Sequence, residues 1–134
     1  MAHLTRIKVR GYHLDLYGHV NNARYLEFLE EARWSLVEER IDLAEWQRRG
    51  LAFTVVKIAI NYRRAASLGD VLEIHSSLSE LGRKSAKIHQ KVYLEGADTL
   101  VADADVTFVI VDATTEKALP LEGEISKSLR ALKT

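Results

Sequence analysis

The sequence lacks cysteine, has a single proline, Pro120, and carries no excess of either charge. Without cysteine there are no disulfides, thiolate nucleophiles or cysteine zinc sites. Nineteen basic and nineteen acidic side chains cancel, and a neutral chain is not typical of a general nucleic-acid binder. His13 and His19 have no third ligand at a suitable spacing, so we expect no metal site and no cofactor.

Long hydrophobic runs are also missing. No apolar stretch approaches the roughly 20 residues that a membrane helix needs. The start, MAHLTRIKVRGYHLD, has no apolar run followed by a small-residue cleavage site, so we expect no signal peptide. These absences predict a cytoplasmic protein without stable membrane insertion.

What is present fits one core. The chain has 134 residues, 47% of them hydrophobic, which is the common size of one domain. We therefore expect residues 1–134 to form a single domain.

The first half of the chain predicts a strand, a long helix and a short helix. Residues 5–13 alternate between apolar and polar, as in a half-buried strand. From Asn22 a helical stripe follows, with Asn21 or Asn22 as its cap. Trp34 lies off this stripe and is either a partly exposed aromatic or a subunit contact. Residues 42–50 resemble a capped short helix. The stripe consists of Tyr25, Phe28, Leu29, Ala32 and Leu36.

The second half predicts four strands and a terminal helix. Residues 51–64 are β-branched and apolar on both faces, which favours a strand inside a covered sheet. Residues 70–81, 83–95 and 99–112 alternate like an antiparallel meander. Residues 122–134 have apolar positions at helical spacing. The order indicates an α+β fold. The small Ala102 and Ala104 and the doubly apolar strand 52–62 suggest either a partner subunit on the face that the long helix leaves open or close packing.

The stretch DLYGHVNNARYLEFLEEARW, residues 15–34, gathers polar groups where the long helix begins. A helix N-terminus presents unpaired N–H groups and partial positive charge. Gly18 lets the loop turn tightly, so Asp15 could lie beside these donors. A carboxylate next to an oxyanion site suits hydrolysis of an activated acyl group. The alternative is that Asp15, Asn21 and Asn22 only shape and cap the turn.

Two blocks of sequence, DLYGHVNNARYLEFLEEAR and AINYRRAASLGDVLEI, resemble the hotdog-fold acyl-CoA thioesterases of the 4-hydroxybenzoyl-CoA thioesterase family. The similarity runs from about residue 6 to residue 125. Within the family, the chain is most similar to bacterial long-chain acyl-CoA thioesterases of the fatty-acid degradation type. One departure is Ala65, where members often have proline.

This resemblance implies an α+β hotdog fold, in which a curved five-stranded antiparallel sheet wraps a long central helix and a C-terminal helix follows. It implies dimers joined edge to edge, often paired into tetramers, with active sites at the subunit boundary. The catalytic acid maps onto Asp15 and the oxyanion donor onto a backbone N–H near Asn22. His19 is a further catalytic candidate. Substrate-binding candidates near the turn are Gly18, Val20, Asn21 and Tyr25.

Coenzyme A carries several phosphate charges, which basic side chains could meet. Arg63 and Arg64 end the long strand, and Lys87 and Lys91 share one face of a later strand. The alternative for the lysines is a solvated strand face.

Three functions compete. The first is hydrolysis of medium- to long-chain acyl-CoA, with Asp15 as nucleophile or general base. The second is a non-hydrolytic acyl-CoA binder or sensor, which does not need Asp15. The third is a hotdog dehydratase or hydratase, which would use a histidine such as His19 together with an acid.

Overall fold

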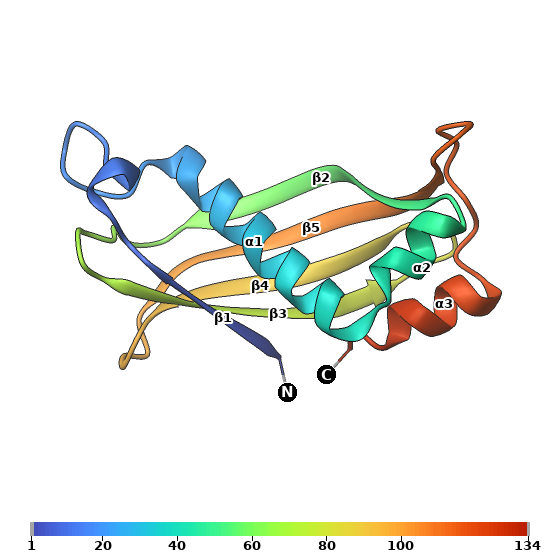
Figure 1. The fold of residues 1–134 in the computed structure, drawn as a ribbon. Helices are drawn as coiled ribbons and strands as arrows, with labels where there is room; N and C mark the ends of the chain where they lie inside the picture. Colours follow the sequence, from blue (N-terminus) through green and yellow to red (C-terminus); the bar gives the residue numbers. More distant parts are fainter. Residues whose placement is uncertain (1, 134) are drawn as a thin grey trace.

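The computed structural model describes residues 2–133, and the order of its elements is the one expected from the sequence (Figure 1). The first strand is shorter than predicted, because Gly11–His13 form one turn of 3₁₀ helix in which His13 Nδ1 accepts from the Arg10 N–H at 2.8 Å. The elements are β1 (His3–Lys8), α1 (Asn22–Arg40), α2 (Leu43–Arg48), β2 (Leu51–Tyr62), β3 (Val71–Leu81), β4 (Ala86–Leu94), β5 (Leu100–Asp112) and α3 (Gly123–Arg130).

The five strands form one antiparallel sheet in the order β1-β3-β4-β5-β2. Strands β3, β4 and β5 follow one another in the sheet as in the chain, which confirms the predicted meander. The helix α1 lies along one face of the sheet, and α2 and α3 pack near its C-terminal end (Figure 1). The α+β hotdog architecture is therefore confirmed.

The predicted stripe of α1 faces the sheet. All five of its residues are buried, and Leu29, Ala32 and Leu36 are fully inaccessible. Ala102 and Ala104 lie beneath the helix in the same cluster as Ala32. For these two alanines the structure bears out close packing, the second of the two alternatives, because their small side chains give α1 room to approach the sheet.

A buried polar group also fixes α1 over the sheet. The Gln90 side chain, fully buried on β4, donates to the Leu29 carbonyl at 3.0 Å and to Ser76 Oγ at 2.9 Å. It accepts from Arg33 Nη1 at 3.1 Å. Since an unpaired buried amide is costly, this network favours one position of the helix.

Strand β2 departs from the expectation of a strand inside a covered sheet. Within residues 2–133 it is an edge strand that pairs with β5 alone, and its register shifts between Val55 and Lys57. Val55 and Val56 are 43% and 57% exposed. An apolar, β-branched run predicts a strand, but it does not indicate whether the same chain or a partner chain covers that strand.

Candidate active site

The loop before α1 closes on itself and holds the Asp15 carboxylate. The Asp15 N–H donates to the His19 carbonyl at 2.8 Å, and the Gly18 N–H donates to the Asp15 carbonyl at 3.1 Å. Gly18 has a φ of +77°, a conformation that favours glycine. Asp15 Oδ1 accepts from the N–H groups of Tyr17 at 2.8 Å and His19 at 3.2 Å. Backbone donors thus fix one carboxylate oxygen, and Oδ2 has no hydrogen bond to residues 2–133.

The start of α1 leaves one donor free. Asn21 is the cap, since its Oδ1 accepts from the Ala23 N–H at 2.9 Å, and its own N–H donates to the His13 carbonyl at 2.9 Å. The Asn22 N–H has no acceptor within the described part of the chain. The Tyr62 hydroxyl donates to the Asn22 carbonyl at 3.0 Å and ties the end of β2 to this turn. A free N–H at a helix start favours negative charge.

These groups share one open pocket of about 360 Å³. Seven sequence candidates line it, whereas Gly18 and Asn21 shape the turn behind it. Tyr62 and Ala65 also line the pocket but were not among the candidates. The sequence signal that could have indicated them is that they flank the Arg63–Arg64 pair. The seven are Asp15, His19, Val20, Asn22, Tyr25, Arg63 and Arg64.

The basic candidates separate into two groups. Arg63 and Arg64 reach the pocket, and Arg63 Nε donates to Asp103 Oδ2 at 2.6 Å. This hydrogen bond is the main reason that the pKa of Asp103 is lowered. Lys87 and Lys91 lie on the face of the sheet away from α1, and Lys87 pairs with Glu80 at 3.3 Å. The structure does not bring these lysines to the Asp15 pocket.

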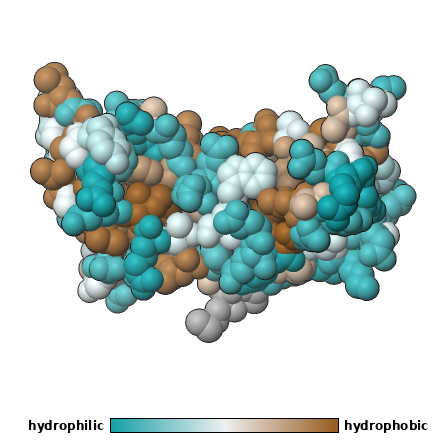
Figure 2. Space-filling view, in the orientation of Figure 1, coloured by the Kyte–Doolittle hydropathy of each residue, from teal (hydrophilic) through white to brown (hydrophobic). Residues whose placement is uncertain are grey.

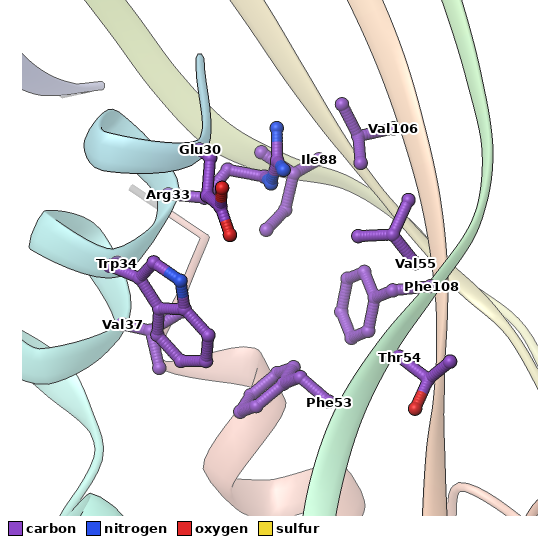
Figure 3. Close-up of a pocket in the computed structure, with 10 residues that line it drawn as sticks. All are labelled: Glu30, Arg33, Trp34, Val37, Phe53, Thr54, Val55, Ile88, Val106 and Phe108. Atoms are coloured by element: carbon purple, nitrogen blue, oxygen red, sulfur yellow. The ribbon is translucent and has the colours of Figure 1, made fainter. Parts of the chain in front are cut away.

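A second, apolar cavity of about 340 Å³ lies between α1 and the strands β2 and β5 (Figure 3). Aromatic and aliphatic side chains form most of its wall, while Glu30 and Arg33 stand at one side (Figure 3). Burial lowers the pKa of the Arg33 guanidinium. The wall consists of Trp34, Val37, Phe53, Thr54, Val55, Ile88, Val106 and Phe108.

Trp34 is 42% exposed in the single chain, which fits both alternatives, and its ring meets Phe53 edge-on at 6.3 Å. It also lines the apolar cavity, a role that neither alternative included. In the space-filling view, hydrophobic surface shows between the polar side chains of this side of the molecule and at the tip of the loop before α1 (Figure 2). Leu16 and Tyr17, in that loop, are 90% and 79% exposed.

Among residues 2–133, no group of three or more histidine and carboxylate side chains is placed to hold a metal ion. No helix of this part of the chain has the length and apolar character needed to cross a membrane.

The fold and the matched residues place the chain in a family. The model of the thioesterase-like superfamily matches residues 9–129, so the chain belongs to that superfamily. It is 54% identical to the long-chain acyl-CoA thioesterase FadM of Escherichia coli K12, over 96% of this chain and 97% of the relative. It is 31% identical to the acyl-CoA thioester hydrolase YbgC of Escherichia coli O6:H1, over 87% and 90%.

A solved structure of a similar protein has the same fold. The crystal structure of YbaW, a probable thioesterase from Escherichia coli, superposes with a TM-score of 0.92 at 52% identity, covering 98% of each chain. Such agreement over the whole length confirms the resemblance to hotdog-fold thioesterases that the two sequence blocks indicated.

Proposed function

We propose that this protein hydrolyses long-chain acyl-CoA thioesters to a fatty acid and coenzyme A, with residues 1–134 acting as one catalytic domain. One observation carries the proposal: the free oxygen of the Asp15 carboxylate and the free Asn22 N–H line the same pocket. Hydrolysis of a thioester needs these two groups together. The names of FadM and YbgC, both acyl-CoA thioester hydrolases, support this reaction class.

The proposed chemistry places the thioester carbonyl oxygen at the Asn22 N–H. As the tetrahedral intermediate forms, its negative charge is stabilised by this donor and by the partial positive charge at the start of α1. Asp15 Oδ2 has two possible roles in forming this intermediate. It attacks the carbonyl carbon to give a mixed anhydride that water hydrolyses, or it takes a proton from the attacking water. Either route expels coenzyme A as the thiol.

The acyl chain is proposed to occupy the apolar cavity. Along α1, Glu30 and Val37 stand 8 and 15 residues beyond Asn22, which corresponds to about 12 and 22 Å at 1.5 Å per residue. A long chain whose carbonyl lies at Asn22 spans such a distance, whereas a short chain does not. The name of FadM, a long-chain thioesterase, supports the same preference.

The coenzyme A phosphates are proposed to meet Arg63 and Arg64, because these two residues line the Asp15 pocket. A double variant with glutamine at both positions should raise KM at low salt, and added salt should reduce the difference, because exposed charges are screened within about 10 Å at 0.1 M. The rate at saturation should hardly change. The matched control replaces Lys87 and Lys91 with glutamine. A rise in KM only in this control would indicate that the phosphates bind at the outer face of the sheet.

The assembly is proposed to be a dimer joined through β2, or a pair of such dimers. Strand β2 offers an unpaired edge with exposed Val55 and Val56. An exposed apolar edge strand is a template for pairing with another chain.

The deciding experiment incubates the purified protein with acyl-CoA of increasing chain length and a thiol-reactive dye. We expect release of free thiol that is fastest with long chains. Saturable binding without thiol release would instead identify a non-hydrolytic binder. Loss of the enoyl absorbance of an enoyl-CoA, without thiol release, would identify a hydratase, for which His19 is the candidate catalytic histidine.

A further inference from the structure

The hydroxyl of Tyr25 is a buried polar group without a partner. Tyr25 is only 3% exposed, and its hydroxyl finds no donor or acceptor among residues 2–133. Leaving a buried hydroxyl unpaired costs free energy, so such groups are rare in folded proteins. Phenylalanine would fill the same space without that cost. Packing alone therefore does not explain the presence of the hydroxyl.

Its position connects it to the proposed active site. Tyr25 lines the pocket that contains Asp15, one helical turn after Asn22. Helical side chains lean toward the N-terminus, so the Tyr25 ring lies over the turn that presents the free Asn22 N–H. The ring packs edge-on against the buried Phe28 at 6.0 Å, which holds it in place, and against the exposed Tyr62 at 5.6 Å.

The hydroxyl is also held in its donor form. Burial, with smaller contributions from Tyr62 and Asp70, raises the pKa of Tyr25 to about 12. The group therefore keeps its proton across the neutral range. A protonated phenol in a water-poor place is a strong hydrogen-bond donor for a negative oxygen.

We propose that the Tyr25 hydroxyl is a second hydrogen-bond donor to the thioester carbonyl oxygen, acting together with the Asn22 N–H. This inference rests on the proposed thioesterase function. The Tyr62 ring, which is 48% exposed and is held to the Asn22 carbonyl by one hydrogen bond, turns aside as the substrate enters. Since the oxygen gains charge only in the transition state, the bond acts on the chemical step more than on binding.

The test is the Tyr25→Phe variant, measured for activity and thermal stability together. We expect kcat to fall about 10- to 100-fold with KM changed less than about threefold. The Tm should stay the same or rise, because an unpaired buried hydroxyl is removed. Affinity for an S-alkyl coenzyme A thioether, which has no carbonyl oxygen, should be equal in the variant and the wild type.

Thr5→Val is the matched control. Thr5 Oγ1 is also buried without a partner, but it lies on β1 and outside the pocket. This variant should also keep or raise the Tm and should leave kcat unchanged.

Two results would overturn the inference. One is a kcat of Tyr25→Phe within about twofold of the wild type. The other is a loss of activity accompanied by a lower Tm and weaker thioether binding, which would show that the ring only supports packing. Absence of thiol release by the wild type would instead refute the proposed function itself.

Discussion

Replacement of Asp15 by asparagine tests the proposed mechanism most directly. The change keeps the shape of the side chain and its Oδ1 acceptor, so the bonds from the Tyr17 and His19 N–H groups can remain. An amide can neither attack the thioester as a carboxylate nor take a proton from water. We expect turnover to fall about 10²- to 10⁴-fold, which corresponds to about 3 to 5 kcal/mol of transition-state stabilisation.

The cost to the fold should be much smaller. Hydrogen bonds to a neutral oxygen are weaker than those to a carboxylate, so the free energy of unfolding should drop by about 1 kcal/mol. Thiol release with a long-chain acyl-CoA and thermal unfolding, measured on the same preparation, separate the two effects.

Asp112 provides a matched control for this prediction. Its Oδ1 also accepts from two backbone N–H groups, those of Thr114 at 2.8 Å and Thr115 at 3.1 Å, and it lies at the opposite end of the molecule (Figure 1). Asp112→Asn should lose similar stability and keep full turnover. Near wild-type turnover in Asp15→Asn, or an equal loss in both variants, would refute the role of Asp15.

Three further predictions address metal dependence, assembly and pH. Activity should persist in a chelator; a complete loss that a divalent ion restores would contradict this. Val56→Lys should shift the mass in solution to the monomer, because it places a charge on the exposed edge of β2; a wild type that is already monomeric would remove the basis for the dimer. Arg63→Gln should lower the Tm at pH 7, because Asp103 loses the hydrogen bond that lowers its pKa. A carboxyl whose pKa is lowered by folding stabilises the protein above its unfolded pKa of about 3.9. The Tm difference should therefore shrink as the pH falls below about 4, and a difference that is constant down to pH 2 would show that the loss does not come from the ionised Asp103 carboxylate.

The local elements followed from the sequence because neighbouring residues determine them. The spacing of apolar residues predicted α1 and its buried stripe. Asn21, one of the two candidates, caps α1, and Asp42 caps α2 at the start of the predicted short helix. Gly18 adopts a positive φ in the turn where the sequence required tight folding. Helix periodicity, caps and turns involve groups only a few residues apart, so the chain itself carries the information.

Tertiary structure alone decided where β1 and β2 join the predicted meander and which face of the sheet α1 covers. The hydrogen bonds between strands use backbone groups that every strand offers. The alternation of side chains along a strand distinguishes two faces, but it does not indicate which face a helix covers. The sequence therefore could not place β2 at the sheet edge, Ala102 under α1, or Lys87 on the opposite face from the pocket. The contact of Tyr62 with Asn22, 40 residues apart, and the unpaired Tyr25 hydroxyl likewise arise only when distant segments pack together.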